Sequence, residues 1–336
     1  MSKRLIMLIG AVLFVIALAA CSSSAVEKEE TGKTEETVNK EETSAEVTEN
    51  NETRVVQDIL GEVTIPVNPK RILASSSNYA EYLIEIGVTP QFAVVVPDIE
   101  PEYRAPYLEE HGVEMLKNKQ YQYNYEQLLS TSPDLIVVAG KIIEPDVYEE
   151  LSKIAPTVAV NAGSDMHGAM TELAELFGKQ EAAEKILAAF DQKAKDAKEK
   201  INQAIGDKSV LILRVEPTRY RYLGPKADDD VSKFFYETLG LRSPEIFKDT
   251  TEWFTPFSLE ILPDIKADYI FVEKRSMEDY DSSESLQELE SNSLWKNMDA
   301  VKNNHVFPLK TNDYVQAKGP IGTGLLIDYI VEKLVP

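Results

Sequence analysis

GKQEAAEKILAAFDQKAKDAKEKINQA, residues 178–204, is the stretch that decides the fold of this chain. It contains no proline, and no glycine after its first residue. Its apolar residues recur at steps of three and four, which places them in one stripe of an α-helix, while charged and amide side chains occupy the other faces. At 1.5 Å per residue such a helix is roughly 40 Å long. It is either a surface helix on one sheet or a rigid connection between two lobes.

On both sides of this stretch, strand patterns alternate with helix patterns. Before it, the apolar strands LIVV (135–138) and TVAV (157–160) each follow a helical segment and a proline turn. After it, the alternation restarts with SVLILRVE (209–216). This spacing predicts an α/β fold with mainly parallel sheets and helices on their faces. The folded part is expected to begin near Val55, with a short hairpin that turns at Gly61.

The amino-terminal segment has the features of a targeting signal and not of a folded domain. Lys3 and Arg4 precede an apolar run over 5–20, and Leu-Ala-Ala-Cys then ends at Cys21. The run is short for a membrane span and typical of a signal peptide. The segment Leu18–Cys21 looks like a bacterial lipobox, so we expect residues 1–20 to be removed and Cys21 to receive a diacylglycerol. An uncleaved anchor helix is the alternative.

Composition narrows the function further. Cys21 is the only cysteine, which excludes disulfides, cysteine metal sites and a thiol nucleophile in the folded part. Residues 21–54 are almost devoid of apolar mass and are expected to form a disordered acidic tether. The net charge of −22 offers no electrostatic basis for binding nucleic acid.

The sequence argues against an enzyme. The three histidines, His111, His167 and His305, lie in unrelated segments without a helical partner, so a histidine-rich metal site is not expected. Ser75–Ser77 lack the surroundings of a nucleophile elbow and are expected to cap the next helix, where they can also face a cleft. The glycine-rich run 319–324 lacks the lysine of a P-loop.

Two stretches are instead suited to the walls of a binding cleft. QYQYNY (120–125) has three tyrosines at alternating positions. RYRY (219–222) places its two arginines on one side of an extended chain and its two tyrosines on the other. Aromatic walls with a few cations fit an anionic ligand. An ordinary surface strand edge is the alternative for each stretch.

In order and spacing these pieces resemble the substrate-binding lipoproteins of bacterial ABC importers, of the class that binds ferric siderophores, haem and cobalamin. The resemblance covers residues 58–334. Its marks are IPVNPKRIL (65–73), LLSTSPDLIVV (128–138), KIAPTVAVN (153–161), the long helix, SLEILPDIKADYIFV (258–272) and SLWKNMDAVKNNHVFPL (293–309). It implies two Rossmann-like α/β lobes, at 55–177 and 205–336, joined by the single long helix 178–204, with the ligand held between them.

The resemblance also nominates site residues. The ligand-binding candidates are Lys119, Tyr121, Lys141, Arg219, Arg221, Tyr222, Trp253 and Tyr314, with Arg275 a weaker one. Core packing is the alternative for Trp253 and the expectation for Trp295. The segments YEQLL (125–129) and LEILP (259–263) are similar to each other, and each precedes a buried strand. By the resemblance, Glu126 and Glu260 in these segments are the candidates for docking on the two permease subunits.

The implied function is capture of a ferric siderophore outside a Gram-positive membrane and its delivery to an ABC permease. A hydroxamate or citrate type is favoured over a catecholate. Iron would be bound only through the siderophore, with no protein metal site or cofactor, and the protein is expected to be a monomer. A haem or cobalamin receptor remains open, as does a cell-surface enzyme or adhesin.

Overall fold

The computed structural model describes residues 52–119, 122–161, 165–277 and 280–336. The signal segment, Cys21, nearly all of the tether and Tyr121 lie outside these ranges. All of the elements below belong to one compact unit, residues 50–336.

The first lobe is built on a parallel five-stranded sheet with the order β5-β4-β3-β6-β7. Its strands are β3 (Ile72–Ala74), β4 (Phe92–Val95), β5 (Glu114–Lys117), β6 (Leu135–Ala139) and β7 (Thr157–Val160). Its helices are α1 (Ser77–Glu85), η1 (Pro97–Ile99), α2 (Arg104–Glu110), α3 (Tyr125–Ser130), α4 (Pro145–Ile154) and α5 (Met166–Phe177). One face packs against α1, α2 and α5, and the other against α3 and α4. The hairpin β1 (Thr53–Gln57) and β2 (Glu62–Pro66) precedes the sheet.

The second lobe has a mixed sheet with the order β10-β9-β8-β11-β14, in which β8, β11 and β14 run parallel and β9 runs antiparallel to both of its neighbours. Its strands are β8 (Val210–Glu216), β9 (Arg219–Leu223), β10 (Phe254–Phe257), β11 (Tyr269–Lys274) and β14 (Val306–Lys310), with the small pair β12 (Ser276–Met277) and β13 (Tyr280–Asp281) beside it. Its helices are α7 (Asp230–Ser232), η2 (Lys233–Thr238), η3 (Glu245–Phe247), η4 (Leu259–Asp264), α8 (Ser283–Ser291), α9 (Ser293–Lys296), α10 (Asp299–Lys302), η5 (Asn312–Gln316) and α11 (Pro320–Leu334).

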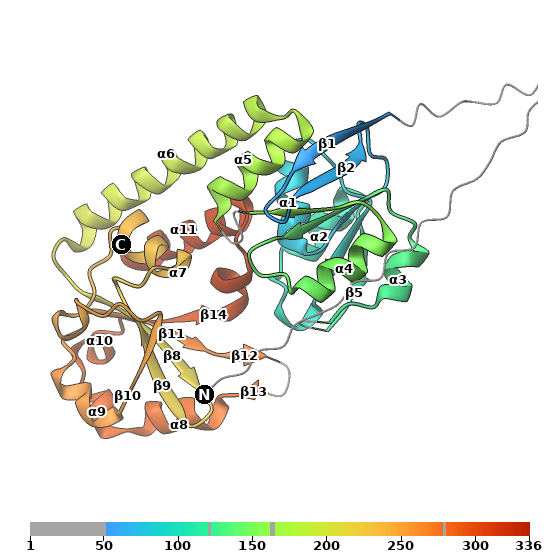
Figure 1. Cartoon of the computed structure of the whole chain (residues 1–336). Coiled ribbons are helices and arrows are strands. Elements are labelled where there is room, and N and C mark those ends of the chain that lie inside the picture. Colours follow the sequence, from blue (N-terminus) through green and yellow to red (C-terminus); the bar gives the residue numbers. More distant parts are fainter. Residues whose placement is uncertain (1–51, 120–121, 162–164, 278–279) are drawn as a thin grey trace, which may run out of the picture. The chain divides into compact units, whose positions relative to one another are not determined.

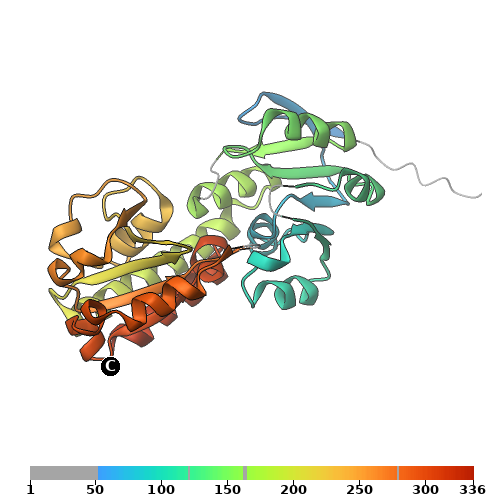
Figure 2. The same cartoon turned by 90° about the horizontal axis from the view of Figure 1, so that it is seen from below.

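The predicted long helix is confirmed as α6 (Gln180–Ile205), 26 residues that lead from the first sheet to the second (Figures 1 and 2). Five residues of the stripe read from the sequence are buried, namely Ala183, Phe190, Ala194, Ala197 and Ile201. Leu187 is half-buried and Ala204 is exposed, because Ile205 takes the buried position at this end of the helix. The five buried residues join a core that also takes in α1 and α5 of the first lobe and α11 of the second. Gly178 ends α5 with a left-handed φ of 65°, which a residue with a Cβ rarely adopts.

Some elements differ from the sequence predictions. The hairpin begins at Thr53, two residues earlier than expected, and turns at Gly61 as predicted. Phe254–Phe257 forms β10 although it contains Pro256, because β10 is the edge of its sheet and a missing N–H is tolerated there. Two short helices, α9 and α10, precede β14, and Met298 between them is extended.

Candidate functional site

A buried ion pair lies near the carboxyl ends of the central strands of the second sheet. Arg214 on β8 and Glu273 on β11 are register partners, and their side chains are 3% and 0% exposed. Burial disfavours the charge on Arg214, but Tyr314 and Glu273 outweigh this effect, so the pKa of Arg214 is raised. Thr311 donates a second hydrogen bond to Glu273. Breaking such a pair from one side would cost about 3–5 kcal/mol, so it fixes this part of the sheet.

Tyr314 and Trp253 are held around the same guanidinium. The Tyr314 hydroxyl accepts a hydrogen bond of 2.8 Å from Arg214 Nη2 and donates one to Glu273. Burial, followed by the charge of Glu273, raises the pKa of Tyr314 well above its ordinary value, so it stays protonated and can donate. Arg214 lies 5.0 Å from the Trp253 ring and 3.6 Å from the Phe254 ring, within the range of cation–π attraction.

Two further arginines lie on this face of the sheet. Arg221 on β9 is the register partner of Arg214, and Arg219 that of Glu216, so the side chains of the four share one face. Arg219 and Arg221 both bond Glu216, the latter at 3.3 Å. Burial raises the pKa of Glu216, but the hydrogen bond from Arg219 and the charges of both arginines outweigh burial and lower it.

Arg275 extends the group at the end of β11. Its Nη1 atom is 3.5 Å from Glu273 Oε1. We call Arg214, Arg219, Arg221 and Arg275, with Glu216 and Glu273, the arginine cluster. Four guanidinium groups against two carboxylates leave an excess of two positive charges in a chain of net charge −22. Within the described ranges, the buried atom Arg221 Nε has no hydrogen-bond partner, and Arg275 Nη1 has none either beyond its ion pair with Glu273.

A cavity of about 190 Å³ adjoins the arginine cluster through Tyr314. Residues from both lobes and from α6 line it, among them His167, Phe190, Phe235, Tyr314 and Lys318. Pockets that hold drug-sized ligands measure about 300–1,000 Å³. The cavity is therefore too small to hold a siderophore complex by itself.

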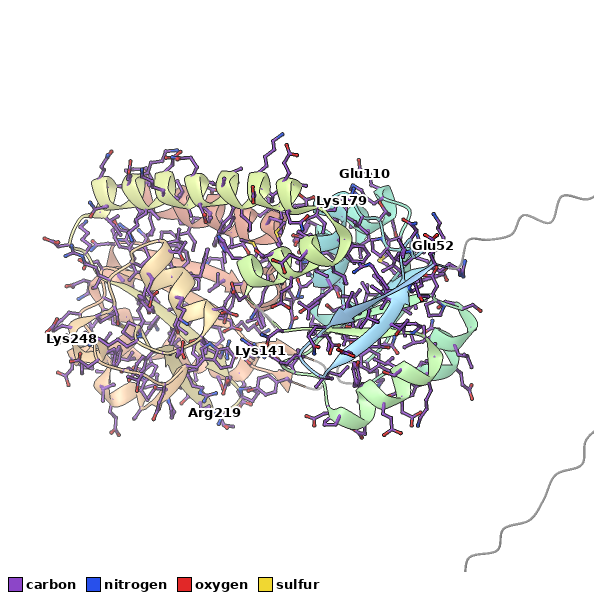
Figure 3. The ribbon with its side chains drawn as sticks, turned by 45° about the horizontal axis from the view of Figure 1, so that its top comes forward. Glu52, Glu110, Lys141, Lys179, Arg219 and Lys248 are labelled. Atoms are coloured by element: carbon purple, nitrogen blue, oxygen red, sulfur yellow. The ribbon has the colours of Figure 1, made fainter. Side chains whose placement is uncertain are left out.

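The structure separates the remaining ligand-binding candidates. Lys119 follows β5 and Lys141 follows β6, both exposed, and Figure 3 shows Lys141 on the first lobe and Arg219 on the second, both on the side away from α6. Tyr222 instead lies on the opposite face of the second sheet, 7% exposed and stacked on Phe247 with ring centroids 3.6 Å apart. Trp253 is 42% exposed and outside the core, whereas Trp295 is buried as predicted.

The two docking candidates occupy equivalent positions in the two lobes. Glu126 is exposed in the first turn of α3, which Asn124 caps, and β6 follows. Glu260 is exposed in the first turn of η4, which Ser258 caps, and β11 follows. The short helices read from the sequence are confirmed, while the docking role stays a prediction. Ser76 caps α1, as expected of the serine run.

Sequence reasoning missed Arg214 and Glu273. A signal was present, because each is a charged residue inside an otherwise apolar strand, VLILRVE and YIFVEK. A charge in a buried strand needs a partner. Neither residue alone indicates which one, since the register of β8 with β11 decides the pair.

Comparison with known proteins identifies the family. The family model described as periplasmic binding protein matches residues 72–312, which span both sheets and α6. This chain belongs to the periplasmic binding protein family. The family is one of substrate-binding proteins. Among the residues that the structure describes, no helix is long and apolar enough to cross a membrane. The same residues contain no group of three or more His, Cys, Asp or Glu side chains that could hold a metal ion.

Two curated relatives of this periplasmic binding protein are proteins of Bacillus subtilis (strain 168). The iron(3+)-hydroxamate-binding protein FhuD is 30% identical over 96% of this chain and 95% of its own length. The probable siderophore-binding lipoprotein YfiY is 28% identical over 98% of both.

Solved structures agree with the fold. A FhuD-fold protein of Bacillus subtilis, described as a component of a Fep/Fec-like ferrichrome ABC transporter, has a TM-score of 0.67 and 29% identity, and the match covers 83% of this chain and 99% of that one. Staphylococcus aureus SirA, solved with staphyloferrin B, has a TM-score of 0.67 and 25% identity over 84% and 98%. The predicted two-lobed α/β fold with one long helix is confirmed.

Proposed function

We propose that this protein binds a ferric siderophore on the arginine cluster, between the two lobes, and delivers it to an ABC permease. The observation that carries the proposal is the excess of two positive charges in the arginine cluster, beside Trp253, which is 42% exposed. Such a surface suits the anionic oxygens and apolar arms of a metal chelate. A relative named for iron(3+)-hydroxamate and a structure solved with staphyloferrin B support the same class.

The proposed ligand contacts combine residues of both lobes. From the second lobe they are Arg219, Arg221, Trp253 and Arg275, with Tyr314 and Arg214 behind them. From the first lobe they are Lys119, Lys141 and Tyr121. Iron would be bound through the siderophore alone, as cargo. A hydroxamate or citrate-type siderophore is favoured, because relatives are named for iron(3+)-hydroxamate and Fe(3+)-citrate.

Delivery of the ligand requires that the protein is held at the membrane and is oriented on the permease. We propose that lipid on Cys21 anchors the monomeric protein on the outer side of a Gram-positive membrane, and that Glu126 and Glu260 pair with positive residues on two permease subunits. Relatives named as lipoproteins support the anchor. Two carboxylates, one on each lobe, would orient the protein on a positively charged partner.

The test is a binding panel read by tryptophan and tyrosine fluorescence. It compares ferric hydroxamates, ferric citrate, a ferric catecholate, haem and cobalamin. The expected result is submicromolar quenching by a ferric hydroxamate or citrate-type complex, and none at that concentration by haem or cobalamin. Tight binding of haem or cobalamin, without any ferric siderophore, would overturn the proposal.

A further inference from the structure

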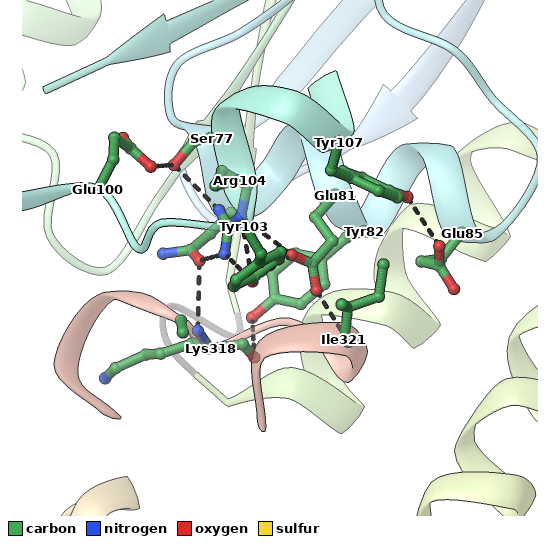
Figure 4. Close-up of polar contacts among 12 residues, drawn as sticks. Ser77, Glu81, Tyr82, Glu85, Glu100, Tyr103, Arg104, Tyr107, Lys318 and Ile321 are labelled. Carbon is green, nitrogen blue, oxygen red and sulfur yellow. Dashed lines mark hydrogen bonds and ion pairs between the residues drawn. The ribbon is translucent and has the colours of Figure 1, made fainter. Parts of the chain in front are cut away.

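A second, polar connection joins the two lobes besides α6. On the first lobe, Arg104 at the start of α2 and Glu81 on α1 form an ion pair of 3.0 Å in which both side chains are fully buried. The Tyr103 hydroxyl donates to Glu81 Oε2 at 2.6 Å, and Arg104 also donates to Ser77 and Asn78 (Figure 4). Arg104, Tyr103 and Glu81 therefore hold one another in place.

This buried group contacts the start of α11 in the second lobe. Glu81 Oε1 accepts the N–H of Ile321 at 3.0 Å. Ile321 lies in the first turn of α11, where an N–H has no partner within the helix, and the dipole of a 15-residue helix favours a negative charge at this end. Glu81 thus caps a helix of the other lobe, as Figure 4 shows.

The residues just before α11 are held in the same way. Asn78 Oδ1 accepts the N–H of Lys318 at 3.3 Å, and the Tyr82 hydroxyl donates to the Lys318 carbonyl at 3.0 Å. The approach is so close that a Cβ on Gly319 would lie 1.8 Å from Glu81 Oε1. Glycine is required at 319 by this contact and not by its backbone, whose φ of −80° suits any residue.

The opposite end of the same segment is also bonded to the first lobe. Asn312, at the start of η5, donates from Nδ2 to the Glu100 carbonyl at 3.1 Å. Tyr314 lies between these two attachments, yet its hydroxyl bonds Arg214 and Glu273 of the second sheet. The segment 312–321 therefore links the first lobe directly to the arginine cluster.

We propose that Glu81, supported by Arg104, is a positioning residue for the ligand-binding site. By capping α11 across the lobe junction, it fixes the segment that places Tyr314 against Arg214, although it lies outside the arginine cluster. This inference rests on the proposed function for its effect on affinity, but its effect on the junction can be measured without ligand.

The test is Gly319→Ala, with Gly324→Ala as the matched control. The first substitution places a methyl group against Glu81, whereas a Cβ on Gly324, in the same helix, would lie 3.5 Å from the Lys193 Nζ atom. In Gly319→Ala we expect faster hydrogen exchange at the amides of Lys318 and Ile321. In a Trp295→Phe background, where Trp253 is the only tryptophan, we also expect a shifted emission maximum. Gly324→Ala should match the parent in both measurements.

Affinity is the third measurement. Displacing a coupled segment should weaken binding of the best ferric siderophore of the panel by roughly threefold to thirtyfold in Gly319→Ala, and not in Gly324→Ala. Tyr82→Phe, which removes only one hydroxyl, should shift exchange and affinity in the same direction by less, and it serves if Gly319→Ala does not fold. Parental exchange and emission in folded variants would overturn the inference, as would faster exchange with parental affinity. A parent that binds no ferric siderophore would instead overturn the proposed function, while exchange and emission still decide the inference.

Discussion

Replacing Arg221 with glutamine tests the role of the arginine cluster, because this substitution should lower ligand affinity with little effect on the stability of the fold. The Arg221 side chain is 27% exposed, and its buried Nε has no hydrogen-bond partner among the described residues. Its neighbour Glu216 is 4% exposed but keeps a second partner in Arg219. The substitution therefore removes a cation from the arginine cluster without leaving a buried carboxylate unpaired.

The magnitude follows from these surroundings. A hydrogen bond from a charged group in a partly desolvated site contributes about 1.5–3 kcal/mol. Arg221→Gln should therefore weaken binding of an anionic ferric siderophore by roughly tenfold to a hundredfold. The free energy of unfolding should fall by about 1 kcal/mol or less, the range of a partly exposed ion pair. Arg214→Gln would differ, because it leaves Glu273 buried without its main partner and should destabilise by about 3–5 kcal/mol.

The assay is fluorescence titration of parent and variant, with urea unfolding measured in parallel. Arg242→Gln is the matched control. This substitution also removes one positive charge, but at the amino end of the same sheet, where Arg242 forms a bridge with Ser209 just before β8. The Arg242 side chain pairs there with the exposed Asp207. Equal affinities for the parent, Arg221→Gln and Arg242→Gln would refute the assignment of the ligand to this face. Equal losses in both variants would show that only net charge matters.

Four further outcomes are expected. Trp253→Ala should lose most of the ligand-induced quenching and part of the affinity, and a fully retained quench would assign the signal to another aromatic residue. The lowered pKa of Glu216 means that its carboxylate stabilises the fold at neutral pH, and that this contribution is lost as pH falls through its folded-state pKa. The free energy of unfolding in urea should therefore vary less with pH in Glu216→Gln than in the parent over the acidic range. Identical pH profiles would contradict this. Cys21→Ser should leave the protein unprocessed or released from membranes, as fractionation would show, and parental processing with membrane retention would reject the anchor. Glu126→Ala and Glu260→Ala should each leave ligand affinity within about twofold, because the sites are independent, yet impair siderophore uptake, most in the double variant; parental uptake at parental protein levels would reject the docking role.

The sequence alone determined the features that depend on local periodicity. The three-and-four spacing over 178–204 predicted α6 to within two residues at each end, because an amphipathic stripe without proline has one regular conformation that buries it. Alternation of strands and helices predicted the parallel sheet of the first lobe and the parallel strands β8, β11 and β14 of the second. The paired segments around Glu126 and Glu260 predicted two short helices before strands. The division into lobes at 177 and 205 stays a prediction.

The tertiary structure decided which residues meet. Alternation along RYRY showed that arginines and tyrosines face opposite ways, but packing of Tyr222 on Phe247 decided that the tyrosine face is the buried one. Arg214 and Glu273 are 59 residues apart and meet because β8 and β11 pair in one register. Glu81 and Ile321 are 240 residues apart. Such contacts depend on register and on the packing of whole lobes, whereas the signals in a sequence reach only a few residues along the chain.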